Sequence, residues 1–163
     1  MKKEITTKQP ESILYILIRN DLPSMSTGKA MAQASHASNA FIKHYGNLSN
    51  AKEWASQTGD GFGTVIVLSA SSLQIDVAFK SLEDPTSTLF NYELPHGKII
   101  DPSYPYIVNS EIAELIDKKC HTVVPIPKSD GNVVLHRKEF TCAYVFGTKE
   151  ELKNVIGHLP LHP

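Results

Sequence analysis

Two short apolar runs separated by a helical segment restrict the fold of this chain more than any other feature. SILYILIR (12–19) and TVIVLSA (64–70) are almost continuously apolar, as strands buried on both faces of a sheet are. Between them, residues 28–45 repeat small and apolar side chains at helical spacing, with Ala30 and Phe41 on one side. A strand, a helix and a second strand in this order normally make a right-handed crossover between parallel strands. The two runs are therefore predicted to be parallel strands of one sheet.

The rest of the chain continues to alternate helix-like and strand-like segments. Further helices are predicted at 50–57, 71–82, 109–119 and 148–159. Strand-like runs are LFNYEL (89–94), GKIID (97–101), HTVVPIP (121–127) and NVVLHRKEFTCAYVFG (132–147). This alternation predicts a three-layer α/β domain. We expect residues 1–11 to be a flexible N-terminus and residues 12–163 to form a single domain.

The charge balance and the cysteines restrict the class of partner and the compartment. Sixteen Lys and Arg residues against seventeen Asp and Glu residues give a formal net charge of -1. Nucleic-acid affinity depends on basic side chains that neutralise phosphates. This charge balance therefore argues against binding of a polyanion over a broad basic surface. Cys120 and Cys142 show no CxxC spacing, which favours reduced thiols and a cytoplasmic setting. No stretch has signal-peptide or membrane-spanning character, so no membrane partner is expected.

Common catalytic and metal motifs are missing from the chain. Its seven histidines form no HExxH motif, and no metal site is expected. No GxSxG elbow is present, and neither cysteine lies in a nucleophile motif. Gly28 and Lys29 do not belong to a phosphate-binding loop, because the upstream Gly and the following Ser or Thr are missing.

The segment STGKAMAQASHAS (26–38) consists mainly of small residues but carries a lysine, a glutamine and a histidine. At about 100° per residue, Lys29, Gln33 and His36 lie within about 60° of one another on the predicted helix. They are therefore placed to contact one ligand, and the positive end of the helix would add to the charge of Lys29. A solvated helix face carries the same residue types, and this alternative stays open.

Two further candidates come from distant parts of the chain. Asp101 follows an apolar run, a position from which carboxylates in α/β sheets often enter a ligand crevice. Capping a turn before Pro102 is the alternative role. Thr141 lies in a predicted strand, where packing is the simpler role.

Several motifs follow one another in a fixed order across most of the chain. They are YILIRNDLPSMSTGKAMAQASHA (15–37), the strand and helix after it, IIDPSYPYI (99–107), the Thr141 strand and LKNVIGHLPLHP (152–163). In order and spacing they resemble the type II peptidyl-tRNA hydrolase superfamily, and a divergent branch of it. The resemblance implies an α/β/α fold around a central mixed, mostly four-stranded sheet, usually in a homodimer. It also implies cleavage of the ester that joins a peptide to tRNA, with no metal or organic cofactor.

The resemblance also implies a site. Lys29, His36 and Asp101 become catalytic residues, in which Asp101 and His36 activate and orient a water and Lys29 stabilises the oxyanion. The partner would be the acceptor end of tRNA or a smaller acyl ester. The implied substrate-binding residues are Asp21, Gly28, Gln33, Ser35 and Thr141.

Two differences from the superfamily pattern leave a second function open. The hydrolases usually have Ala-Gly-x-Thr after the aspartate, whereas this chain has PSYP (102–105), so Pro105 replaces the expected threonine. Residues near 108–138 are predicted to be an inserted segment. A non-catalytic ligand-binding or regulatory module on the same fold is therefore the alternative to a hydrolase.

Overall fold

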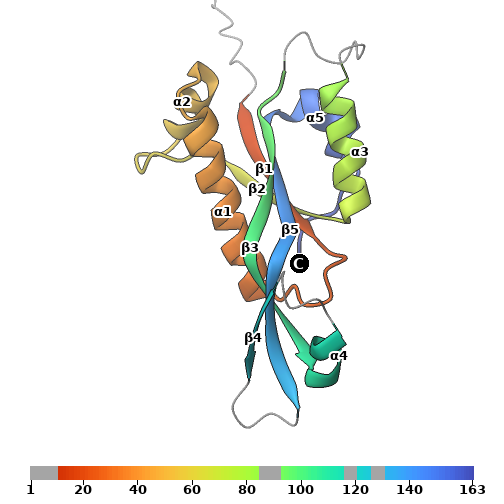
Figure 1. Cartoon of the computed structure of the whole chain (residues 1–163). Helices are drawn as coiled ribbons and strands as arrows, with labels where there is room; N and C mark the ends of the chain where they lie inside the picture. The colour runs from red at the N-terminus through yellow and green to blue at the C-terminus, as the bar shows by residue number, and fades with distance from the viewer. Residues whose placement is uncertain (1–10, 85–92, 116–120, 126–130) are drawn as a thin grey trace, which may run out of the picture.

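The computed structural model describes residues 11–84, 93–115, 121–125 and 131–163 (Figure 1). The strands in this part of the chain are β1 (Ser12–Arg19), β2 (Val65–Ala70), β3 (His96–Asn109), β4 (His121–Pro125) and β5 (Asn132–Thr148). The helices are α1 (Thr27–Tyr45), α2 (Ser49–Ala55), α3 (Ser72–Glu83), α4 (Ser110–Leu115) and α5 (Lys149–Ile156). None of these helices combines the length and the apolar character needed to cross a membrane.

The strands form one mixed sheet with the order β2-β1-β5-β3, and β4 pairs with β5 outside this path. β1 and β2 pair in parallel, with Leu14 opposite Val65 and Arg19 opposite Ala70, which confirms that the two strands are parallel. β5 is antiparallel to β1, β3 and β4. The predicted mixed sheet is confirmed, with four strands in a continuous path and β4 as a fifth.

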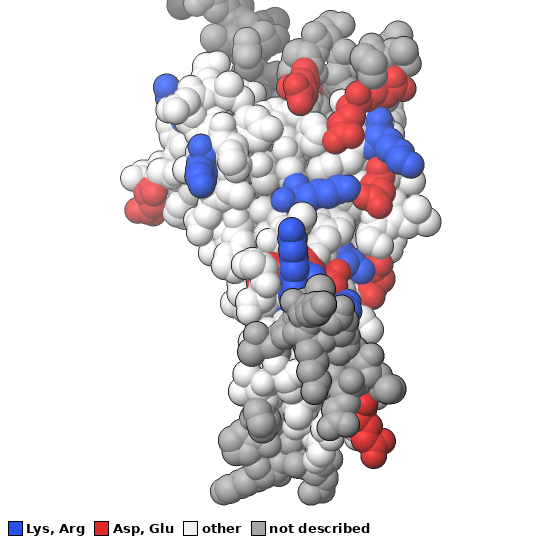
Figure 2. All heavy atoms as spheres, viewed as in Figure 1, with Lys and Arg blue, Asp and Glu red and all other residues white. Residues whose placement is uncertain are grey.

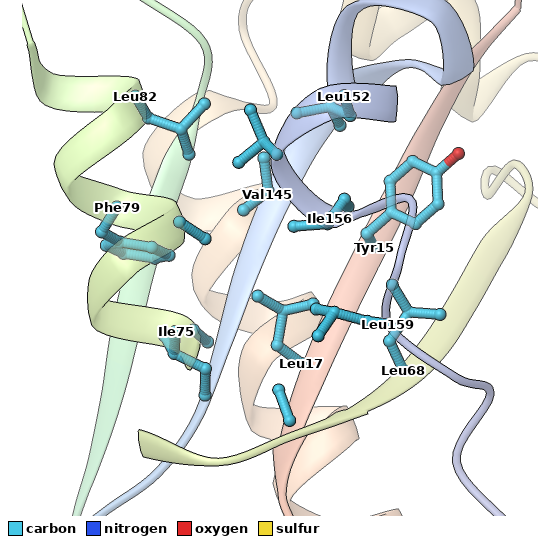
Figure 3. Close-up of a cluster of buried hydrophobic side chains, with 14 of the residues drawn as sticks. Tyr15, Leu17, Leu68, Ile75, Phe79, Leu82, Val145, Leu152, Ile156 and Leu159 are labelled. Carbon is cyan, nitrogen blue, oxygen red and sulfur yellow. The ribbon is translucent and has the colours of Figure 1, made fainter. Parts of the chain in front are cut away.

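Helices cover both faces of the sheet, with α1 and α2 on one side and α3 and α5 on the other (Figure 1). Leu14, Ile16 and Ile18 of β1 pack with α1 and α2. Tyr15 and Leu17, which alternate with them, pack with α3 and α5 in the cluster that Figure 3 shows. Because successive strand residues point to opposite faces, both sides of β1 are buried, and the continuous apolar run is explained. The three-layer α/β/α architecture is confirmed.

Phe41 holds α1 and α2 against the sheet. Its ring centroid lies 5.6 Å from that of Trp54, edge to face, and 4.6 Å from that of Phe146. Ala30 and Ala37 of the same helix are almost fully buried and let the helix backbone approach the strands. The small residues of 26–38 on this side therefore pack against the sheet, as predicted.

The helix ends follow local sequence signals. Thr148 Oγ1 accepts a hydrogen bond from the Glu151 amide, and Glu151 Oε2 accepts one from the Thr148 amide, so the two residues form a capping box at the start of α5. Ser26 is the N-cap of α1 and accepts from the Lys29 amide. The helix predicted at 109–119 is described as α4, and its last residues, from 116, lie outside the described part of the chain.

β3 and β5 extend beyond the three layers as a narrow arm that also carries α4 and β4 (Figure 1). The sequence predicts a short strand at 97–101, but β3 continues through Pro102 and Pro105 to Asn109. Proline is tolerated there because β3 is an edge strand, whose outer side needs no ladder hydrogen bond. Residues 132–147 form one strand, and most of the strand-like run 89–94 lies outside the described residues.

Candidate functional site

A buried glutamine on α1 joins two strands of the sheet. Gln33 is only 3% exposed. Its Nε2 donates a hydrogen bond of 2.7 Å to Asp101 Oδ2, and its Oε1 accepts one of 2.6 Å from Thr141 Oγ1. Both ends of the amide are thus paired, as a buried amide requires. Three of the predicted site residues, Gln33, Asp101 and Thr141, meet in one network.

Thr141 reaches Gln33 because the β3–β5 pair is irregular at this point. Ile99 lies opposite Cys142 and Ile100 opposite Phe140, so Thr141 is an extra residue in β5. Phe140 packs with the α3 and α5 cluster, and Cys142 packs with the α1 cluster. The extra residue lets Thr141 face α1 together with Cys142 instead of facing the opposite layer. Nothing in the sequence indicates this bulge.

A second irregularity of the same strand pair holds the Asp101 carboxylate. Asp101 lies opposite Glu139 and Tyr104 opposite Arg137, so two residues of β3 face a single residue of β5. Asp101 Oδ1 accepts a hydrogen bond of 2.9 Å from the Ser103 amide, as in an Asx turn. The local capping role and the contact with Gln33 therefore coexist, one on each carboxylate oxygen.

An open hollow of about 380 Å³ borders this carboxylate. Asp101 and His36 both line it, together with His44 and Lys98. The His36 side chain is exposed, one helical turn from Gln33. An imidazole and a carboxylate that face the same space are suited to activating and orienting a water.

Lys29 lies at a neighbouring hollow rather than at this one. Its Nζ donates a hydrogen bond of 2.6 Å to the Pro105 carbonyl and lies 5.0 Å from the centroid of the Tyr104 ring. The hollow beside it is also lined by Ser24, Ser26 and Tyr106. In the described residues no hydrogen bond or ion pair joins Lys29 to His36 or Asp101. The two hollows share no lining residue, and both border β3, one at Asp101 and Pro102 and the other from Tyr106 onward.

Partial burial makes the Lys29 ammonium easier to deprotonate. Burial lowers the pKa of the Lys29 ammonium from its usual value of 10.5, because the charged form loses hydration. The carbonyl of Pro105 and the face of the Tyr104 ring replace part of that hydration. The ammonium is thus placed at a site where its charge is screened less than on an open surface.

Gly28 and Ser35, two other predicted substrate contacts, border open space. A methyl group added at Gly28 would meet no atom within 4 Å, so the protein itself does not require glycine there. Ser35 is exposed on α1. Their roles at a substrate remain predictions.

Asp21 is exposed, but both of its carboxylate oxygens accept hydrogen bonds from other residues of the protein. Its Oδ1 accepts a hydrogen bond of 2.7 Å from Arg19 Nε, and its Oδ2 accepts bonds from the amide and the hydroxyl of Ser72. These contacts tie the end of β1 to the first turn of α3. Burial raises the pKa of Asp21, but the bonds from Arg19 and Ser72 outweigh it and lower the pKa to about 2.

The Asp21 contacts predict a pH dependence of stability. Since the folded pKa of about 2 lies below the usual value of 3.8, the stabilisation is fully present above pH 3.8 and is lost as the pH falls towards 2. We expect the melting temperature of Asp21→Asn to approach that of the wild type as the pH is lowered through this window. Circular dichroism melts at pH 7 and pH 2.5 measure it, with Asp60→Asn as the control. A constant difference between wild type and Asp21→Asn at both pH values would contradict the assignment.

Sequence reasoning missed a second carboxylate near the site, Glu139. It accepts hydrogen bonds from Arg19 (2.9 Å), Tyr106 (2.6 Å) and Arg137 (2.8 Å). Burial raises the pKa of Glu139, but the bonds from Tyr106 and Arg137 outweigh it and lower that pKa. Glu139 therefore stays ionised and joins β1, β3 and β5 where the arm begins. A glutamate in a strand-like run carries no signal that would have identified this role.

Cys142 is a free, buried cysteine. Burial raises the pKa of the Cys142 thiol to about 12, and its Sγ donates to the Gln33 carbonyl. It is therefore a packed thiol and not a thiolate nucleophile. The described residues contain no cluster of three or more His, Cys, Asp or Glu side chains that could hold a metal ion.

Comparison with known families identifies the class of the chain. The family model of peptidyl-tRNA hydrolase PTH2 matches residues 12–102, more than half of the chain, and the chain belongs to this family. The matched region includes Lys29, Gln33, His36 and Asp101, and it ends before Pro105. A search of curated proteins gives no significant match.

Proposed function

We propose that this protein hydrolyses the ester that joins a peptidyl or aminoacyl group to tRNA. Membership of the peptidyl-tRNA hydrolase PTH2 family supports a substrate related to tRNA. The observation that carries the proposal is the Asp101 carboxylate, which Gln33 and Ser103 hold at the border of an open hollow that His36 also lines. A carboxylate held in this way can accept a proton from a water without losing its position.

The proposed reaction begins with a water between Asp101 and His36. Asp101 takes a proton from this water as its oxygen attacks the ester carbonyl carbon, and His36 orients the water. The carbonyl double bond opens to an oxyanion. When the double bond forms again, the bond between the carbon and the ribose oxygen breaks. The proton passes to that oxygen, and the products are a free carboxylic acid and a tRNA hydroxyl.

Lys29 and the start of α1 stabilise the oxyanion in this proposal. For this role the Lys29 ammonium exchanges the Pro105 carbonyl for the substrate oxygen. The exchange is favourable because the oxyanion carries a negative charge that attracts the ammonium, whereas the Pro105 carbonyl is neutral. The positive end of the α1 dipole acts in the same direction.

The partner is the acceptor end of tRNA, bound over a small area. Figure 2 shows basic and acidic side chains interspersed on the face in view, which does not resemble a continuous phosphate-binding surface. Recognition then depends on local contacts around the two hollows, and not on the field of the whole molecule. The homodimer and the cytoplasmic location stay predictions.

The direct test is release of the amino acid from N-acetyl-aminoacyl-tRNA by the purified full chain. We expect ester loss well above the rate without protein, and a lower rate with His36→Ala. Lys43→Ala is the matched control, because Lys43 is an exposed lysine on the same helix. Wild-type protein that leaves the ester intact would overturn the proposal.

One observation favours a non-catalytic binding module as the second candidate. The Lys29 ammonium is already bonded to Pro105, the residue that replaces the expected threonine. Such a module would be stabilised by tRNA without cleaving the ester. Ligand at about 100 times Kd adds about 2.7 kcal/mol of stability, so a melting-temperature shift without turnover identifies this case.

A further inference from the structure

A third hollow lies on the opposite face of the sheet, between β1, β2 and α5. Its volume is about 490 Å³, within the usual range of small-molecule pockets. The walls are largely apolar and include Ile13, Ile66, Leu68, Leu152, Ile156 and Leu159. This face packs against α3 and α5, whereas Gln33 and Asp101 lie on the side of α1. The hollow is therefore separate from the proposed hydrolytic site.

One polar side chain, Tyr15, lines this otherwise largely apolar hollow. Tyr15 is 7% exposed and lines the hollow, and its hydroxyl has no hydrogen-bond partner in the described part of the chain. Figure 3 shows its hydroxyl directed away from the apolar cluster formed by Leu17 and its neighbours. Burial raises the pKa of Tyr15, so the hydroxyl keeps its proton and can donate. The hydroxyl keeps some solvent contact and has no partner within the described residues, so a ligand acceptor can reach it.

Two lysines lie at the mouth of the hollow. Lys149 and Lys153 are one turn apart on α5, line the hollow and are exposed. Neither makes an ion pair within the described residues. Glu150 also lines the hollow, so the mouth carries two positive charges and one negative charge. The balance favours a ligand with a single anionic group.

We propose that this hollow binds an amphipathic carboxylate, namely a medium-chain aliphatic acid. The chain packs against the apolar walls from β1, β2 and α5, and the carboxylate accepts a hydrogen bond from Tyr15 Oη. Lys149 and Lys153 neutralise its charge at the mouth. The proposal is independent of the hydrolase assignment, because it uses none of the residues of that site.

Titration with decanoate, followed by isothermal calorimetry and by amide NMR shifts of the full chain, tests the proposal. We expect saturable binding with shifts confined to β1, β2 and α5. Tyr15→Phe should weaken the binding about tenfold, the effect of one hydrogen bond to a charged group. The double variant Lys149→Gln and Lys153→Gln should weaken it and reduce its salt dependence. Lys29→Ala, on the other face, should bind decanoate as the wild type does.

The apo melting temperature separates a binding role of Tyr15 from a structural one. Since the hydroxyl has no partner inside the described part of the protein, Tyr15→Phe should melt no lower than the wild type while it binds decanoate more weakly. Equal affinity of Tyr15→Phe and wild type would overturn the proposal. So would shifts around His36 and Asp101, the absence of saturation at millimolar decanoate, or a dimer that buries this hollow and excludes decanoate.

Discussion

Replacing Asp101 with asparagine lowers kcat/KM for N-acetyl-aminoacyl-tRNA about 10²- to 10⁴-fold, the usual contribution of a general base. The amide cannot accept the proton of the attacking water, although it has nearly the same shape as the carboxylate. Steady-state release of the acetylated amino acid measures the loss. We expect the melting temperature of the variant to stay close to that of the wild type.

The fold should survive because the hydrogen-bond network can reverse its direction. In Asp101→Asn, the new side-chain amide can still accept from the Ser103 amide and can donate to Gln33 Oε1 if the Gln33 amide turns over. Gln33 Nε2 then donates to Thr141 Oγ1, whose hydroxyl has the Ile99 carbonyl as another acceptor at 3.4 Å. A drop in activity without a drop in melting temperature therefore reports chemistry and not unfolding.

The controls for Asp101 separate the base from its support. Asp60→Asn removes an exposed carboxylate far along the chain and should leave the rate unchanged. Gln33→Leu keeps the Asp101 carboxylate but removes its partner, so it should lower both the melting temperature and the rate. If Asp101→Asn retains wild-type kcat/KM, Asp101 is not the base and the mechanism fails.

The parts of the fold that were predictable have local causes. The continuous apolar run of β1 reflects burial by α1 and α2 on one face and by α3 and α5 on the other. The capping box of α5 involves only Thr148 and Glu151, which are three residues apart. Such signals lie within one or two turns of the chain, so they can be recognised without the remaining structure.

The extension of β3 depends on the whole sheet and was not predictable from local signals. Pro102 and Pro105 indicate a break, and a proline in a central strand would remove a ladder hydrogen bond. β3 tolerates both because nothing pairs with its outer edge in the described part of the chain. Edge position follows from the order of strands far apart in the sequence, which no local pattern reveals.

The candidate site was predicted by residue type but not by arrangement. The helical spacing predicts Lys29, Gln33 and His36 on one side of the helix, within reach of one ligand, but Lys29 and His36 line different hollows. The packing of α1 against β3 and β5 determines the arrangement of these side chains. Gln33 is hydrogen-bonded to Asp101 and Thr141, whereas Lys29 and His36 line separate hollows. The bulge at Thr141 creates this arrangement, and a bulge is a property of the β3–β5 pairing.

Lys29→Ala provides the second large expected effect. If the Lys29 ammonium stabilises the oxyanion, its removal lowers kcat about 10²- to 10³-fold, as the loss of one oxyanion donor typically does. KM should change little, because the negative charge on the carbonyl oxygen develops only in the transition state. Single-turnover hydrolysis of N-acetyl-aminoacyl-tRNA isolates this step from product release.

Lys43→Ala is the matched control for this experiment, since it removes a lysine from the last turn of the same helix without touching either hollow. Lys29→Ala loses one hydrogen bond to Pro105 and one contact with the Tyr104 ring, so it should still fold.

The pH profile of the hydrolysis rate gives an independent check on the role of Lys29. Because burial lowers the pKa of Lys29, the wild-type rate should begin to fall before the rising pH reaches 10.5, as the ammonium loses its proton. The alanine variant lacks this group and should show no such fall. Undiminished hydrolysis by Lys29→Ala would contradict the role of the ammonium, and the backbone amides at the start of α1 would then stabilise the oxyanion alone. Lys29 would serve only to hold Pro105 in place.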